Sequence, residues 1–368
     1  MNLQSTQDKL DRHLSFLQQD EHNLNLLLEV SNLYSELNDL DKVQVYLNKA
    51  KVINPEACLA PQGLLALKQG NIQEAKEYFQ EALLHNNSPD LHYNLGFTYY
   101  INNELDQALS ILSSIKDPES LNSSQLLIAR ILHQQNQLEQ AISLLEEQVK
   151  QDPDEAEALG FLSLLYFDVN NEALAHEFSQ RALELSPDLY DAQLVELMLR
   201  LLHQETNIEE IEKLIEINPE DSRLWFALGS TYMSQGDFSS AEEHLQNTLK
   251  IHPEFYDCYI ALAWCQLLND KLDEAHETYQ NAISTVDNLA DGWGGLAIIY
   301  ALNADLEKAE QLINKAQSLN PECFLTQIAQ TIYLTYKNPQ EAQQHLLTML
   351  TNQQLLVSEK IALVINEL

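Results

Sequence analysis

The most reactive side chains in this sequence are a histidine and two cysteines in one short stretch. His252 precedes Cys258 and Cys265, which lie seven residues apart on one predicted helix. A cysteine thiolate beside an imidazole can act as a nucleophile, and the same side chains bind zinc. Two buried cysteines on a packed helix explain the pattern equally well. We favour that interpretation, because Cys58, Cys258, Cys265 and Cys323 lack the short paired spacing of a zinc site or a disulfide framework.

Other catalytic motifs are missing from the sequence. It contains no phosphate-binding glycine loop, no Gly-x-Ser-x-Gly elbow and no His-Glu-x-x-His helix. His176, His244 and His276 lie in predicted helices among charged residues, so we expect them on solvated surface. The sequence therefore predicts no catalytic residue, no metal ligand and no cofactor, in a protein that is not an enzyme.

The elements that carry these residues are predicted to be helices. Glycine and proline number only 9 and 10 in 368 residues, so few positions can break a helix. Hydrophobic residues make up 45% of the chain, which is enough to form a folded core. Few strands or long loops are expected, and one extended repeat array accommodates the length.

The chain is acidic along its whole length. It has 56 Asp and Glu against 20 Lys and Arg, which gives a net charge of −36. This charge argues against nucleic acid or an anionic membrane surface as the partner and favours a basic or neutral protein. Acidity also keeps a long array soluble, an interpretation that requires no partner.

The sequence predicts no export signal and no membrane span. Residues 1–9 lack the basic start and apolar stretch of an export signal. Nowhere do 18 consecutive apolar residues occur. Because no disulfide pattern is present either, the reducing cytoplasm is the predicted location.

Two markers recur in the sequence with a period of about 34 residues. Prolines are separated by 34, 64, 34, 32, 34 and 68 residues, at Pro55, Pro89, Pro153, Pro187, Pro219, Pro253 and Pro321. Small residues in helical runs have gaps of 33, 33, 34, 66, 34, 34 and 33, at Ala75, Ala108, Ala141, Ala175, Ala241, Ala275, Ala309 and Ala342. The constant phase of the two markers indicates one supersecondary unit copied about ten times.

Residues 222–253 show that the unit has two helices. The first half places apolar side chains at helical spacing, and residues 235–237 then form a turn. The second half carries another apolar stripe and ends before a proline. Gly229 and Ala241 are small, which predicts that the two helices cross closely there.

These residues resemble the signature of the tetratricopeptide repeat family. The match is carried by Trp225, Leu228, Gly229, Tyr232, Ala241 and Pro253. Partial matches extend the resemblance over about residues 24–350, with Val43 and Glu209 standing where a small residue is expected. The resemblance implies an all-α fold, an α-solenoid in which about ten tandem helix hairpins form a right-handed superhelix.

The predicted organisation is one continuous solenoid with a cap at each end. Residues 24–350 form the repeats, residues 1–23 an N-terminal capping helix and residues 351–368 a C-terminal capping helix. A stacked repeat cannot bury its own outer face, so terminal repeats require such covers.

The resemblance also implies that the first helices of the hairpins line a concave groove for a partner peptide or helix. Apolar stripes beside the core positions of these helices are the candidate groove residues: Tyr93, Phe97, Tyr100, Phe161, Leu164, Phe167, Phe226, Met233, Ile260, Trp264 and Leu267. Aromatic and methionine side chains anchor many interfaces. The alternative is that the same side chains pack against neighbouring first helices.

The predicted function is a protein-interaction scaffold or adaptor. Its partner is a protein or peptide with basic flanks, since carboxylates surround the predicted groove. One group in this family clamps the C-terminal carboxylate of heat-shock chaperones with Lys, Asn and Arg, but Lys68, Arg130 and Arg223 do not fall in the required relation. The alternative function is a recognition or regulatory subunit of an enzyme, secretion or assembly system whose catalysis another chain supplies.

Overall fold

The computed structural model describes residues 3–116, 118–203 and 207–352. Within these residues it contains 21 α-helices and one short 3-10 helix (Glu56–Cys58), and it has no strand. The prediction of an all-α fold built from tandem helix hairpins is therefore confirmed.

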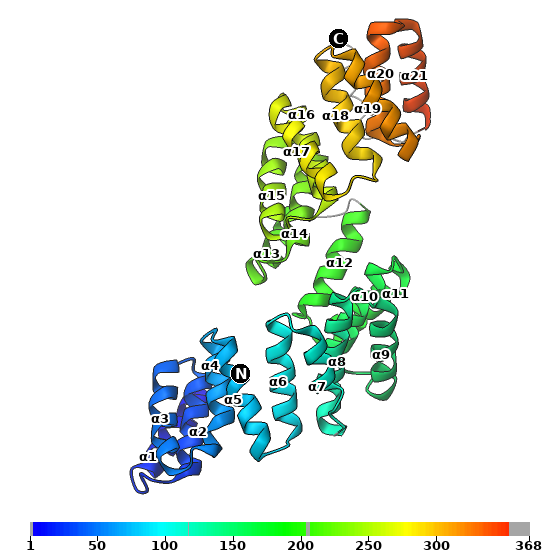
Figure 1. The fold of residues 1–368 in the computed structure, drawn as a ribbon. Helices are drawn as coiled ribbons and strands as arrows, with labels where there is room; N and C mark the ends of the chain where they lie inside the picture. Colours follow the sequence, from blue (N-terminus) through cyan, green and yellow to red (C-terminus); the bar gives the residue numbers. More distant parts are fainter. Residues whose placement is uncertain (1–2, 117, 204–206, 353–368) are drawn as a thin grey trace. The chain divides into compact units, whose positions relative to one another are not determined.

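After α1 (Leu3–Leu17), the helices follow one another as ten successive pairs (Figure 1). The first helices are α2 (Leu24–Glu36), α4 (Leu59–Lys68), α6 (Pro89–Ile101), α8 (Pro118–Gln134), α10 (Ala156–Asp168), α12 (Tyr190–Leu202), α14 (Ser222–Ser234), α16 (Tyr256–Leu268), α18 (Ala290–Leu302) and α20 (Phe324–Lys337). The second helices are α3 (Leu40–Ile53), α5 (Ile72–His85), α7 (Leu105–Leu112), α9 (Leu138–Gln151), α11 (Glu172–Leu185), α13 (Ile208–Ile217), α15 (Phe238–Ile251), α17 (Leu272–Thr285), α19 (Leu306–Leu319) and α21 (Pro339–Asn352).

The chain divides into two compact units, residues 1–196 (unit 1) and 197–368 (unit 2), with the boundary inside α12. Unit 1 contains α1 to α11 and unit 2 contains α13 to α21. The single continuous array over residues 24–350 stays a prediction, and each unit is described by itself.

Small residues lie where the two helices of a hairpin cross. The eight alanines of the 34-residue period are at most 5% exposed. At Gly229 an added Cβ would lie 2.8 Å from Cγ of Leu245, so the predicted close crossing is confirmed. Two repeats lack the expected small residue. In one of them Val43 is buried in its place, and in the other Glu209 is exposed and the nearby Ile211 is buried.

The turns within the hairpins supply a third periodic feature. In eight hairpins a residue with positive φ lies two residues after the end of the first helix. These residues are Asn38, Gly70, Asn103, Asn136, Asn170, Gly236, Asp270 and Ala304. Glycine and asparagine tolerate this conformation, whereas alanine is strained in it. Of these turns, the sequence indicates only the one around Gly236.

The two predicted caps differ in what the structure describes. Within the expected N-terminal cap, residues 1–23, helix α1 begins at Leu3 and packs on α2 with Leu10 and Leu17 buried. The expected C-terminal capping helix, residues 351–368, lies outside the described residues beyond Asn352. No helix in the described part of the chain is both long and apolar enough to cross a bilayer.

Candidate partner-binding surface

The cysteines that could have done chemistry are structural. Cys258 and Cys265 are 0% exposed, and burial raises the pKa of each thiol to about 12. The Cys258 thiol donates to the carbonyl oxygen of Leu245 at 3.3 Å, whereas His252 is exposed and its ring contacts Phe255. The buried-cysteine interpretation is therefore confirmed. Among the residues that the structure describes, no cluster of three His, Cys, Asp or Glu side chains could hold a metal ion.

The three histidines expected on solvated surface differ. His176 is exposed, as predicted. His276 is half buried. The expectation is wrong for His244, whose ring lies between Trp225 and Tyr232, with centroid distances of 5.8 and 5.2 Å. Burial lowers the pKa of His244, and its Nδ1 atom has no hydrogen-bond partner.

Two neighbouring first helices of unit 1, α4 and α6, expose large apolar side chains. Leu64, Phe97 and Ile101 are 42%, 37% and 39% exposed, and we call these residues the first-helix face of unit 1. Leu64 follows Gly63 and Phe97 follows Gly96 one repeat later. Both glycines are buried at the crossing with the second helix, so Leu64 and Phe97 occupy equivalent positions on the next face of their helices.

Leu64 and Ile101 were missed by sequence reasoning. The repeat itself carried the signal for Leu64, since it precedes Phe97 by 33 residues. Ile101 follows the predicted Tyr100 at the end of α6. Tyr93 and Tyr100 are half buried, because they pack on the cluster around Leu127 and Ile131 at α8.

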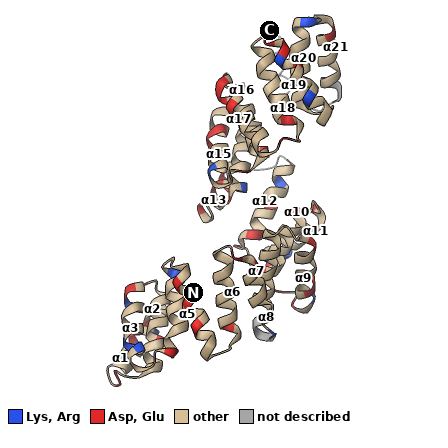
Figure 2. Ribbon diagram, in the orientation of Figure 1, with Lys and Arg blue, Asp and Glu red and all other residues tan. Residues whose placement is uncertain are grey.

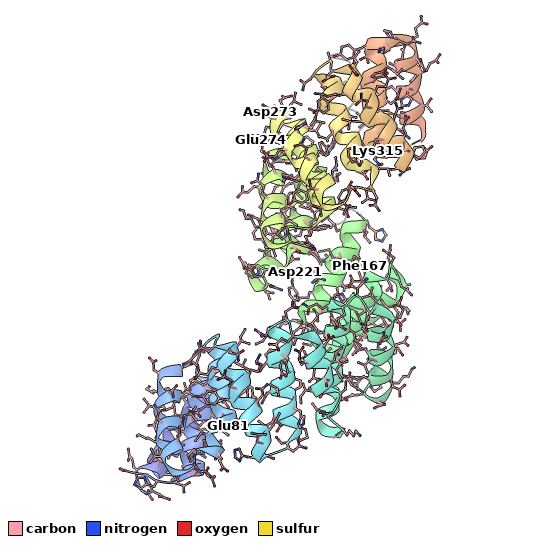
Figure 3. All side chains as sticks on the ribbon, in the orientation of Figure 1. Glu81, Phe167, Asp221, Asp273, Glu274 and Lys315 are labelled. Carbon is pink, nitrogen blue, oxygen red and sulfur yellow. The ribbon has the colours of Figure 1, made fainter. Side chains whose placement is uncertain are left out.

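The predicted residues of α10 do not join this face. Phe161 and Leu164 are only 2% and 4% exposed. Arg130 of α8 lies over the Phe161 ring, with its Cζ 4.4 Å from the centroid, and the ring of His133 packs edge-on at 5.7 Å. Phe167, at the end of α10, is half buried (Figure 3). Phe161 and Leu164 therefore belong to the packed interior of unit 1.

Charges of both signs lie near the first-helix face of unit 1, with Lys68 in the last turn of α4, four residues after Leu64. Arg130 is paired with Asp191, at 2.7 Å between Nη2 and Oδ2. Asp90 and Glu157 are exposed in the first turns of α6 and α10. Burial raises the pKa of Tyr93 and the negative charge of Glu157 raises it further, whereas the positive charge of Arg130 opposes the shift. Carboxylates are spread over both units (Figure 2).

In unit 2, the predicted residues of α14 are covered by their neighbours. The rings of Phe226 and Phe255 are 4.8 Å apart. Phe226 and Met233 are half buried against the cluster that contains Cys258 and Leu262. Both predicted residues therefore pack on a cluster that α15 and α16 form together.

The predicted residues of α16 are covered in the same way. Ile260, Trp264 and Leu267 are half buried against a core cluster with residues from α16 to α21. Trp264 meets Phe324 edge-on at 6.2 Å. Gly294 of α18 allows the close approach of α20, because an added Cβ would lie 2.8 Å from the backbone nitrogen of Thr326.

Repeat models identify the family of this chain. Models described as tetratricopeptide repeat match residues 66–131, 126–190, 210–243, 232–288 and 290–323, which together cover more than half of the chain. The chain belongs to the tetratricopeptide repeat family. This fold is typically a non-catalytic scaffold for protein interactions, and that general role applies to the present repeats. No curated protein sequence matches the chain.

Several solved tetratricopeptide repeat structures are similar in fold. One is the Cut9–Hcn1 hetero-tetramer of the APC/C, at 15% identity over 97% of this chain and 77% of that chain, with a TM-score of 0.48. YrrB, described as having an unusual peptide-binding site, has 20% identity over 50% and 97% of the two chains, with a TM-score of 0.41. Pseudomonas aeruginosa pilF has 16% identity over 56% and 96%, with a TM-score of 0.44.

Proposed function

We propose that the chain is an interaction scaffold whose first-helix face in unit 1 binds an apolar peptide or helix with basic flanks. The observation that carries this proposal is the exposure of Leu64, Phe97 and Ile101 on two neighbouring first helices. A partner that covers these side chains removes apolar surface from water, which favours association.

The charges near this face support a cationic partner. Asp90 precedes Phe97 by seven residues, two turns along the same face of α6, and Glu157 interacts electrostatically with Tyr93. The nearby cation Arg130 opposes Glu157 at Tyr93, but its own charge is paired with that of Asp191. A peptide with lysine or arginine beside its apolar residues therefore complements the face, and the net charge of −36 favours its encounter.

The proposal is tested with a random peptide library displayed on phage and selected on the full chain. We expect the selected peptides to carry an apolar core next to Lys or Arg. A synthetic peptide from this set should bind Phe97→Ala at least about fivefold more weakly, since exposed aromatic anchors contribute about 1 kcal/mol or more. Its association rate should fall as salt screens the carboxylates.

Leu84→Ala is the matched control, because Leu84 is 84% exposed on the second helix α5. Its affinity for the peptide should equal that of the parent. Selected peptides without basic residues, or equal binding by Phe97→Ala and the parent, would contradict the proposal.

The continuous array and the location complete the proposal. The 34-residue period of small residues runs through both units, which supports one array over residues 24–350. All four cysteines are buried free thiols, which supports a reducing compartment such as the cytoplasm.

A further inference from the structure

A hollow of about 590 Å³ lies at the N-terminal end of unit 1, away from the first-helix face at Phe97. Its apolar walls come from three helices: Leu14 and Leu17 of α1, Leu27 of α2 and Tyr46 of α3. A hollow of this size accepts one or two large apolar side chains.

Exposed apolar side chains stand at the edge of this hollow. Val52 and Ile53, in the last turn of α3, line it and are 87% and 41% exposed. Val45, seven residues before Val52 on the same face of α3, is 50% exposed. One surface therefore carries both an apolar cavity and apolar side chains that project into solvent.

Opposite charges lie on the rim of the same hollow. Glu21 follows α1, and Lys49 is on α3 with its Nζ 5.0 Å from the centroid of the Tyr46 ring. Among the described helices only α3 carries three lysines, while the chain as a whole is strongly acidic. Because Glu21 and Lys49 carry opposite charges, two copies of the chain can meet at the hollow without an excess of like charge.

We propose that this N-terminal face binds the same face of a second copy in a two-fold symmetric dimer. In such a pair each residue i contacts residue j of the other copy, so a surface must complement itself. The face does so in shape, because Val52 of each copy can enter the hollow of the other. It also does so in charge, because Glu21 of each copy can meet Lys49 of the other.

Sedimentation velocity of the full chain between about 1 and 100 µM tests the proposal. The parent should show a monomer–dimer equilibrium. Val52→Asp places a carboxylate in the contact and should raise the dissociation constant at least about tenfold. Leu84→Asp is the control with the same added charge at an equally exposed leucine of α5, and it should change the constant by less than about twofold.

Charge reversal identifies the symmetric contact. Glu21→Lys and Lys49→Glu should each weaken the dimer, and the double variant should restore it. A monomeric parent at the highest concentration, or equal effects of Val52→Asp and Leu84→Asp, would overturn the proposal. Single and double charge variants with purely additive losses would overturn it as well, since the dimer would then use another contact. These residues are distinct from Phe97, so failure here leaves the peptide-binding proposal intact.

Discussion

The first helices of the two units carry similar aromatic residues but bury them to different extents. In unit 1, Phe97 is 37% exposed between Leu64 and Ile101, which are exposed too. In unit 2, Trp264 is half buried and contacts Phe324 of α20. The same repeat position therefore serves as surface in one unit and as packing in the other.

In unit 2 a later first helix reaches the aromatic residue. In α18 of unit 2, Gly294 allows α20 to come within van der Waals contact of the helix backbone, which brings Phe324 to Trp264. In unit 1 the glycine of α6, Gly96, faces the second helix of its own hairpin and leaves Phe97 uncovered. The approach of α20 thus covers Trp264, whereas Phe97 stays exposed.

The largest expected effect is on the free energy of unfolding when Trp264 is truncated, with truncation of Phe97 as the comparison. Trp264→Ala removes the contact with Phe324 of α20 and the packing on the surrounding core cluster, and should lower the free energy of unfolding by about 3 kcal/mol. Phe97→Ala removes a partly exposed side chain and should cost less than about 1 kcal/mol. Urea unfolding followed by circular dichroism measures both.

Trp264→Phe serves as the control for this comparison, because it keeps part of the apolar contact and should lose less than Trp264→Ala. Equal losses for Phe97→Ala and Trp264→Ala would show that the two positions do not differ as surface and packing.

A smaller effect is expected at the hairpin turns, where the two units also differ. Asn103 of unit 1 and Ala304 of unit 2 have φ angles of 59° and 57°. Asparagine tolerates this region, whereas alanine costs about 1 kcal/mol or more there. Ala304→Gly should therefore raise the free energy of unfolding, measured by urea denaturation, by about 0.5 to 1 kcal/mol. Asn103→Gly should change the free energy of unfolding by only about a few tenths of a kcal/mol. A larger gain at Asn103 than at Ala304 would contradict this explanation of the turns.

Features that lie within one hairpin could be predicted from the sequence. The crossing residues Gly229 and Ala241 follow from helical spacing and the 34-residue period. The burial of Cys258 and Cys265 follows from their place on one packed helix without the spacing of a zinc site or disulfide. Both signals depend only on residues that are close in sequence or repeated in phase.

Features that depend on contacts between successive repeats could not be predicted. Phe161 has the spacing of a surface residue, yet Arg130 and His133 of the preceding first helix cover its ring. The hydrophobic periodicity of the sequence does not show which neighbouring ring an arginine or histidine side chain will cover. The sequence also did not show that Ala304 takes a positive φ, because alanine is a rare residue in that conformation.

One hairpin in each unit contains a stacked aromatic pair. In unit 1 the rings of Tyr166 and Phe178 are stacked at 5.5 Å, and in unit 2 those of Tyr232 and His244 are stacked at 5.2 Å. Phe178 and His244 each follow the buried alanine of their repeat by three residues, so they are equivalent positions. Unit 2 therefore has a titratable ring where unit 1 has a phenyl ring.

Burial lowers the pKa of His244 below its ordinary value of 6.5, although Glu243 and Glu212 oppose the shift. The unfolded chain then binds more protons than the folded chain as the pH falls through this range. The contribution of the neutral His244 ring to folding stability is therefore fully present above about pH 6.5 and is lost as the pH falls below it. Burial also lowers the pKa of His345, so part of the decrease in the parent has another source.

Exchanging the two rings should exchange the pH dependence between the units. His244→Phe should reduce the loss of stability between about pH 7.5 and pH 5.5, because phenylalanine cannot be protonated. Phe178→His should increase the loss, since the Arg181 guanidinium carbon lies 5.4 Å from the Phe178 ring centroid and disfavours a second positive charge. Both changes should be smaller than the effect at Ala304, and urea midpoints at the two pH values measure them. If His244→Phe kept the full pH dependence of the parent, the stacked ring of His244 would not be its source, and His345 would be the next residue to replace.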